Sequence, residues 1–437
     1  MVFLHQFSKK RVFAAGAVTL VGSYGFNKAR HLLSVGLFNR RWGVRYLPNQ
    51  QRPVSADYLL NEAPRTPSFI TGSEAVMEAV KRANVDMAIA YPITPQSESM
   101  HLVGDLYAQG YLKDYFRAEN EFAVMAAIHG AALGGGRVFT ATSGPGTLRA
   151  MEMFPVWAGA RQPIVCAFMC RGVALPTSIQ PENIEMSMLL DTGMLMFHAE
   201  DGQDFFDMLL KAYVIAENSD VHLPVGVFVD GFFVTHTRDT VLLPSAELKL
   251  EPYNCEKAPV PCFDMETPPI RVTRDPLLNK SNFISYAANA SWHQEVIAAA
   301  DRARKYIKRY LGGLLEVENP DAKIFIVASG TAVSQGREAL QALQAAGLSV
   351  GLIKIKAIRP FPEAEIVAAT EKAELIVVPE FNAGGWLARE IKAAISDNQR
   401  VVAGPRVFGG MTMPKELIMD EIYQALAKQR QGGSVCL

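Results

Sequence analysis

The stretch Tyr91-Pro92-Ile93-Thr94-Pro95, followed by Gln96-Ser97-Glu98-Ser99, indicates the fold of this 437-residue chain. An apolar segment, residues 85–90, ends directly before it. Because proline fixes φ and lacks a backbone N–H, the two prolines predict a rigid turn at the end of a strand. Ligands of open α/β sheets bind beyond the carboxyl ends of the strands, where the hydroxyl of Thr94 would lie. Taken alone, such a stretch is more often an ordinary stiff turn, so its neighbours decide its meaning.

A carboxylate at the start of the next predicted helix is the second candidate. Residues 116–130 predict a short strand and then a helix that begins near Glu121, with small residues that allow a ligand ring to approach closely. A buried carboxyl needs a partner, which the nitrogen of a heteroaromatic ring would supply. The alternative is that Glu119 and Glu121 only stabilise the positive end of the helix dipole.

Hydroxyls and glycines follow the next apolar strand, in the run Thr140-Ala141-Thr142-Ser143-Gly144-Pro145-Gly146-Thr147. Glycines there allow close backbone approach, and N–H groups at the start of a helix predicted over residues 148–157 would bind polar or anionic groups. A further strand, residues 163–170, delivers Arg171 to the same edge of the sheet, where its guanidinium would bind a carboxylate bidentately. A surface ion pair is the alternative for Arg171.

Together and in this order, the motifs resemble those of the α subunit of the thiamine diphosphate-dependent 2-oxoacid:ferredoxin oxidoreductases. This family includes pyruvate, 2-oxoglutarate, indolepyruvate and phenylglyoxylate enzymes. The resemblance runs from about Phe69 to the C-terminus. It implies that Glu121 hydrogen-bonds the aminopyrimidine ring of thiamine, and that Thr94 and Arg171 contact the substrate carboxylate. The other residues that it places in the cofactor site are Tyr91, Pro92, Ile93, Ser143 and Gly144.

The implied fold is α/β: a pyrimidine-binding domain of thiamine enzymes, built on a doubly wound parallel sheet, and a domain like the C-terminal domain of transketolase. Residues 69–243, where apolar strands alternate with helical segments, predict the first domain. Residues 321–430 predict the second. Between them, residues 244–320 are rich in proline and predict a linker or wrapping region with a helix over residues 292–310. Residues 1–68 predict an N-terminal extension that packs against another subunit.

One motif of thiamine enzymes is missing. Their diphosphate is held through Mg²⁺, which takes oxygen ligands, by a motif that begins Gly-Asp-Gly. The sequence holds only Glu200-Asp201-Gly202 and Val229-Asp230-Gly231. We therefore expect the chain to supply the pyrimidine half of a site shared with a β subunit that carries the diphosphate and the Mg²⁺, and to be inactive alone.

The resemblance also implies the reaction and the partners. A 2-oxoacid would be oxidatively decarboxylated to its acyl-coenzyme A, and electrons would pass through iron–sulfur clusters of other subunits to ferredoxin or, through a flavin subunit, to NAD. A γ subunit and a ferredoxin-like δ subunit are the expected carriers. No motif here assigns the contacts of coenzyme A.

Composition and cysteines limit the remaining classes. With 49% hydrophobic residues and a net charge of −1, the chain offers no electrostatic case for nucleic acid or an anionic membrane. Its five cysteines form no CxxC motif, so we expect a reduced, cytoplasmic protein without a cluster of its own. The apolar stretch after Lys9-Lys10-Arg11 is too short to span a bilayer, and a targeting role is the minority view.

The substrate is the least determined feature. Residues 172–176 and the methionine-rich stretch 186–197 predict an apolar wall that suits pyruvate or an aryl 2-oxoacid such as phenylglyoxylate. The methionines are as typical of plain core. A 2-oxoglutarate enzyme, and a non-catalytic scaffold of the same fold, stay open as alternatives. A transketolase-like transferase fits the domain types but not the motifs.

Overall fold

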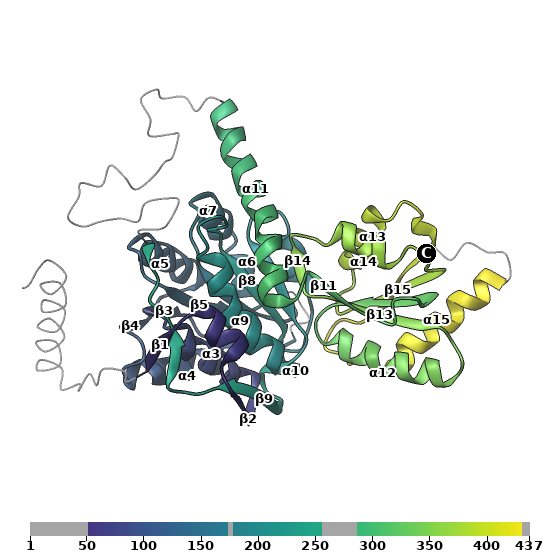
Figure 1. Cartoon of the computed structure of the whole chain (residues 1–437), viewed down its shortest axis with the longest axis horizontal. Coiled ribbons are helices and arrows are strands. Elements are labelled where there is room, and N and C mark those ends of the chain that lie inside the picture. The colour runs from purple at the N-terminus through teal and green to yellow at the C-terminus, as the bar shows by residue number, and fades with distance from the viewer. Residues whose placement is uncertain (1–50, 174–177, 256–285, 431–437) are drawn as a thin grey trace, which may run out of the picture. The chain divides into compact units, whose positions relative to one another are not determined.

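The structure is a computed structural model that describes residues 51–173, 178–255 and 286–430 of the chain (Figure 1). Most of the expected N-terminal extension and part of the expected linker lie outside these ranges. The strands of the described residues, in chain order, are β1 (Arg52–Val54), β2 (Arg65–Thr71), β3 (Met87–Ala90), β4 (Asp114–Arg117), β5 (Val138–Thr142), β6 (Val165–Cys170), β7 (Leu195–Ala199), β8 (Val225–Asp230), β9 (Arg238–Pro244), β10 (Leu248–Leu250), β11 (Leu315–Glu318), β12 (Ile324–Ala328), β13 (Val350–Ile355), β14 (Ala357–Arg359), β15 (Leu375–Glu380) and β16 (Val401–Arg406).

Side chains cap the N-terminal ends of α3, α5 and α9. The α-helices of the described residues are α3 (Gly72–Ala83), α4 (Gln96–Ala108), α5 (Glu121–Leu133), α6 (Pro145–Arg149), α7 (Met153–Gly159), α8 (Ile184–Leu189), α9 (Gly202–Ala216), α10 (Gly231–Thr235), α11 (Tyr286–Leu311), α12 (Ala332–Ala345), α13 (Glu363–Ala369), α14 (Trp386–Ala394) and α15 (Lys415–Arg430). Thr71 and Glu74 form a capping box at α3, and Asn120 and Asp201 accept backbone N–H groups at the starts of α5 and α9.

The predicted doubly wound sheet is confirmed. Its seven strands are ordered β14-β7-β8-β6-β5-β3-β4, and all neighbours are parallel except β14, which runs antiparallel to β7. The side chains of β6 alternate between two apolar clusters, with Ala167 facing the one that contains α3 and α9, and Phe168 facing the one that contains α5 and α7. Cys166 and Cys170 are fully buried in this strand.

The second predicted α/β region is a five-stranded sheet ordered β11-β13-β12-β15-β16. Helices α12 and α15 cover one face, and α13 and α14 cover the other (Figure 1). Its apolar strands are buried on both faces, since Ile326 packs toward α12 and Val327 packs toward α14. The run Ile358-Arg359-Pro360 leaves this sheet, and β14 joins the seven-stranded sheet beside β7.

The segments next to the predicted domain boundaries pair with the first region. β1 lies parallel to β10, and β2 pairs antiparallel with β9, so residues 52–71 are tied to residues 238–250. Helix α11 contains the helix predicted over residues 292–310, and its apolar side packs into the same cluster as α9. The boundaries themselves, and the role of residues 1–50, stay predictions.

One predicted helix was wrong. The sequence favoured a single helix over residues 148–157, but the chain forms α6 and α7, separated at Ala150. Pro155 gives the physical reason, because a continuous helix would place it in the interior, where it has no N–H to donate and its ring clashes with the preceding turn. In the structure Pro155 lies in the first turn of α7, where proline is tolerated.

Candidate functional site

The predicted site residues follow the carboxyl ends of β3, β4, β5 and β6, which are neighbours in the sheet. Thr94 lies in the turn after β3, Ser143 and Gly144 follow β5, and Arg171 follows β6. Because these strands are parallel, their carboxyl ends meet at one edge. The fold therefore collects these residues from segments up to 77 positions apart.

Three of these residues are in direct contact. The backbone carbonyl of Thr94 accepts a hydrogen bond from Nη1 of Arg171 at 2.8 Å and from Oγ of Ser143 at 3.4 Å. Thr94 as a whole is exposed. Burial lowers the pKa of Arg171, which the carboxyl group of Glu185 partly offsets. A guanidinium stays protonated at neutral pH, so a fixed positive charge lies beside the Thr94 turn.

Gly144 is required by its surroundings. Its φ of +47° is a conformation that side chains rarely adopt, and a Cβ there would lie 2.7 Å from Cγ of Arg171. The turn therefore lets the side chain of Arg171 lie directly against the backbone of Gly144. This contact fixes the guanidinium relative to the turn.

Glu121 is the first residue of α5 and is 6% exposed. Within the described residues its charged partner is Arg149, whose Nε lies 3.9 Å from Oε2. A Cβ on Gly146 would lie 2.7 Å from Oε1 of Glu121, so the carboxylate faces the Gly-Pro-Gly turn at close range. The structure thus places Glu121 beside this turn, with no other partner among the described residues.

The remaining predicted residues form the turn after β3. Tyr91 and Ile93 are half-buried, and Pro92 is exposed. Sequence reasoning missed Gln96, which is fully buried: its side chain accepts from the N–H of Ile93 at 3.4 Å and donates to the carbonyl of Ala141 at 3.0 Å. The signal in the sequence was a glutamine directly after Thr94-Pro95. In the structure this glutamine lies on the inward side of α4.

Glu185 was also missed. It is fully buried in α8, and its Oε1 accepts the N–H groups of Gly144 at 2.9 Å and Arg171 at 3.3 Å. Burial raises its pKa to about 8, although the hydrogen bonds from Gly144 and Arg171 act in the opposite direction. The only sequence signal was an acidic residue within an apolar, methionine-rich stretch.

Several buried polar atoms near this edge have no hydrogen-bond partner within the described residues. They are Oγ1 of Thr142, Oγ1 of Thr147, Nε of Arg171 and Oε2 of Glu185. Buried polar groups are normally satisfied, so each unsatisfied one requires an explanation, such as an ordered water or a functional role. These atoms are themselves buried, and they lie around the close backbone approaches at Gly144 and Gly146.

The methionines of the predicted apolar wall belong to the core instead. Met186, Met194 and Met196 are each at most 2% exposed and lie in an apolar cluster, whereas Met188 is 42% exposed. Because buried core side chains do not reach a ligand, this stretch does not distinguish between substrates. Residues 174–176, the other part of the predicted wall, lie outside the described residues.

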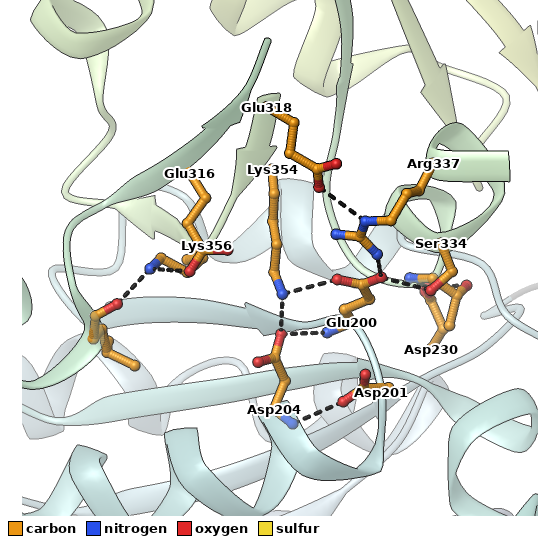
Figure 2. Close-up of polar contacts among 12 residues, drawn as sticks. Glu200, Asp201, Asp204, Asp230, Glu316, Glu318, Ser334, Arg337, Lys354 and Lys356 are labelled. Carbon is orange, nitrogen blue, oxygen red and sulfur yellow. Dashed lines mark hydrogen bonds and ion pairs between the residues drawn. The ribbon is translucent and has the colours of Figure 1, made fainter. Parts of the chain in front are cut away.

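The carboxyl ends of β7 and β8 carry a second group of charged residues, and the second region meets them there (Figure 2). Glu200 accepts from Arg337 at 2.7 Å and from Ser334 at 2.6 Å, and Lys354 lies 2.8 Å from its other oxygen. Lys354 also contacts Asp204 at 2.6 Å. Burial alone would raise the pKa of Glu200, but these partners outweigh it and lower the pKa.

Asp230 extends this contact between the two regions. Its Oδ2 accepts from the N–H of Thr331 at 2.7 Å and from the Thr331 hydroxyl at 2.6 Å. His198 contacts Ser329 through Nδ1 at 3.0 Å, and its Nε2 lies 3.6 Å from Oδ1 of Asp230. A Cβ on Gly330 would lie 2.3 Å from Cε1 of His198, so the regions meet without space for another atom.

A cavity of about 540 Å³ lies beside this contact, lined by residues that include Glu200, Asp201, Thr331 and Ser334. None of the sequence-predicted site residues lines it. Among the described residues, no group of three or more His, Cys, Asp or Glu side chains is arranged to hold a metal ion. We found no described helix that is both long and apolar enough to cross a membrane.

Comparisons with known proteins agree with this arrangement. Residues 78–302 match the family model "Pyruvate flavodoxin/ferredoxin oxidoreductase, thiamine diP-bdg", and residues 322–417 match "Pyruvate:ferredoxin oxidoreductase core domain II". The chain therefore belongs to the family of α subunits of the 2-oxoacid:ferredoxin oxidoreductases. The family resemblance read from the motifs is confirmed.

Named relatives differ in their substrates. The chain is 35% identical to a pyruvate synthase subunit PorA of Methanothermobacter thermautotrophicus, over 76% of this chain and 88% of the relative. It is 30% identical to the α subunit of an NADH-dependent phenylglyoxylate dehydrogenase of Aromatoleum evansii, over 74% of this chain and 81% of the relative. A solved 2-oxoglutarate:ferredoxin oxidoreductase of Magnetococcus marinus shares the fold, with a TM-score of 0.67 and 22% identity over 83% of this chain and 65% of that chain.

Proposed function

We propose that this chain binds the pyrimidine end of thiamine diphosphate and the carboxylate of a 2-oxoacid in an acyl-coenzyme A-forming 2-oxoacid oxidoreductase. The observation that carries the proposal is the contact of Arg171 with the carbonyl of Thr94 and the backbone of Gly144, at the carboxyl edge of a parallel sheet. Family membership supports the same activity.

Arg171 would hold the substrate carboxylate. Its Nη1 donates a hydrogen bond to the backbone carbonyl of Thr94, and this contact orients the guanidinium. Its Nε is buried against Gly144, so the outer nitrogens of the guanidinium would bind the carboxylate. The hydroxyl of Thr94 would add one more hydrogen bond to the same carboxylate.

Glu121 would hold and move a proton at the aminopyrimidine ring. When bound, thiamine diphosphate would supply the carbon nucleophile that attacks the 2-oxo group. Glu121 is buried, faces the Gly-Pro-Gly turn, and has only a distant cation as a partner in the described chain. A ring nitrogen would therefore give this carboxyl the close partner that a buried acidic group needs.

Other subunits would complete the enzyme. Because no Gly-Asp-Gly motif is present, we propose that a β subunit holds the diphosphate through Mg²⁺. Electrons would leave through iron–sulfur clusters of γ and δ subunits toward ferredoxin or, through a flavin subunit, NAD. Such soluble carriers agree with a cytoplasmic complex.

For the substrate we propose pyruvate or another 2-oxoacid with an apolar side chain, in agreement with the names of the pyruvate synthase and phenylglyoxylate dehydrogenase relatives. The alternative is a member specific for 2-oxoglutarate, which would need a further cation for the second carboxylate. At the described edge Arg149 would be that cation beside Arg171, although it already lies near Glu121.

The experiment is dye reduction by the whole complex with coenzyme A and either pyruvate, phenylglyoxylate or 2-oxoglutarate. Arg171→Ala should raise KM for the preferred acid on the order of 10- to 100-fold, because a charged hydrogen bond is lost. Lys113→Ala, which removes an exposed cation at the amino end of β4, serves as the control for a general loss of positive charge. An unchanged KM in Arg171→Ala would contradict the carboxylate role, and a wild-type complex that oxidises none of the acids would favour a scaffold.

A further inference from the structure

Glu185 connects two segments of the candidate site. Oε1 accepts the N–H of Gly144, in the turn after β5, and the N–H of Arg171, at the end of β6. These strands are neighbours in the sheet, but their hydrogen-bonded ladder ends at Thr142 and Phe168. Beyond that point the Glu185 carboxyl is what joins the two backbones.

Gly144 needs an acceptor because it is buried. Its N–H donates to Oε1 of Glu185 in a buried hydrogen bond. A buried backbone donor that loses its acceptor costs the full price of its desolvation. The side chain of Arg171 fills the space where a Cβ of Gly144 would lie, so the position of Gly144 determines that of the guanidinium.

The chain distance makes this contact informative. Glu185 lies 41 residues after Gly144 and 14 after Arg171, in a short helix of otherwise apolar inward residues. A fully buried carboxyl in such a place is costly, and its other oxygen, Oε2, has no partner in the described part of the chain.

We propose that Glu185 is a positioning residue that holds the Gly144 turn against Arg171 and thereby sets where the guanidinium meets the Thr94 carbonyl. The inference rests on the proposed function, because the carboxylate role of Arg171 gives this position its importance. Glu185 does not touch the substrate in this arrangement. It acts through Arg171, and so its loss should change substrate binding more than turnover.

The test is a double-mutant cycle in the assembled complex. Glu185→Ala should raise KM for the preferred 2-oxoacid about tenfold with a smaller change in kcat, since a buried donor loses its acceptor. In the Arg171→Ala background the same change should have little further effect, because residues that act through one another are not additive. Glu185→Gln retains the accepting oxygen and should restore a KM close to that of the wild type.

Glu380→Gln is the matched control. Glu380 is also a buried carboxyl whose oxygens accept backbone N–H groups, those of Leu387 and Ala388, but it lies in the second region. It should leave KM unchanged. If Glu185→Ala does not assemble with its partners, Glu185→Asp, which withdraws the carboxyl by one methylene group, takes its place in the cycle.

The outcomes separate the two proposals. A raised KM in Arg171→Ala with an unchanged KM in the Glu185 variant overturns the positioning role alone. Equal effects of the Glu185 change with and without Arg171 also overturn it, because the two residues would then act independently. An unchanged KM in Arg171→Ala itself contradicts the proposed function first.

Discussion

The carboxyl edge of one sheet has two unlike halves. At β7 and β8, charged side chains meet partners from the second region: Glu200 has Lys354, Arg337 and Ser334, and Asp230 has Thr331. At β3, β5 and β6, buried polar atoms of the described residues are left without partners, among them Nε of Arg171 and Oγ1 of Thr142. Both halves are built by parallel strands of the same sheet.

The difference teaches which half is available to a ligand. Parallel strands offer polar side chains and backbone groups all along their carboxyl ends. In this chain the second region contacts one half, where its Arg337 and Lys354 meet Glu200 (Figure 2), although Nε2 of His198 and Oδ1 of Asp230 make no hydrogen bond within the described residues. Polar side chains at β7 and β8 therefore contact the second region, and we propose that those at β3 to β6 serve the cofactor and the substrate.

The largest expected effect is at the half formed by β3 to β6. Glu121→Gln should lower kcat about 10²- to 10⁴-fold while the complex still assembles, because the carboxyl loses its ability to transfer a proton. The measurement is steady-state dye reduction, with size-exclusion chromatography to establish assembly. Glu119→Gln is the control, since Glu119 lies two residues earlier and outside α5. Near-normal turnover of Glu121→Gln would remove Glu121 from the proposed site.

At β7 and β8, a substitution should lower the stability of the protein and should not lower its catalytic rate. Glu200→Ala should lower the free energy of unfolding by about 1–3 kcal/mol, because Lys354 and Arg337 each lose one of their two carboxylate partners, Lys354 keeping Asp204 and Arg337 keeping Glu318. Denaturant unfolding measures it. The exposed pair of Lys323 and Glu374 supplies the control, and Glu374→Ala should cost less than about 1 kcal/mol. A Glu200 variant of native stability but with lost turnover would contradict the division between the halves.

The smallest expected effect is a difference in pH dependence. The folded-state pKa of Glu185 is about 8, above its usual 4.5, so its contribution to stability is complete below about pH 4.5 and is lost as the pH rises through 8. Arg171 and Cys170 face it, and burial raises the pKa of Cys170. Glu185→Gln should therefore flatten the fall in unfolding free energy between pH 5 and 8, by a few kcal/mol at most.

Asp230 should behave in the opposite way. Burial would raise its pKa, but the interactions with His198 and Thr331 outweigh burial and lower it. Its contribution is thus present above the usual value of 3.8 and is lost as the pH falls through the folded-state pKa. Urea titrations of Glu185→Gln and Asp230→Asn across the same pH range compare the two halves directly. Parallel profiles for the two variants would contradict this contrast.

The positions of residues that follow the ends of strands could be predicted from the sequence. Thr94, Ser143, Gly144 and Arg171 each lie within four residues of the end of a strand, and parallel topology brings such positions together. Their roles in catalysis stay predictions. Glu185 and Gln96 were missed because their partners lie 41 and 45 residues away, and nothing local to either residue identifies those partners.

A residue within the segment itself explains why the predicted helix over residues 148–157 was wrong. Pro155 already excluded the continuous helix over residues 148–157. The methionines near residue 190 could not be assigned to a wall or to the core by composition, because both environments are apolar. Only the packing of β7 and α8 into the core decided it.

Strand β14 has a consequence for how the chain could be divided. It belongs in sequence to the second region but covers the outer edge of β7, with Ala357 opposite Phe197. A fragment that ended before residue 357 would leave the backbone N–H and C=O groups of β7 exposed, which is a surface that recruits strands from other molecules. The two regions, although each has its own sheet, are therefore protected from aggregation only as one continuous chain.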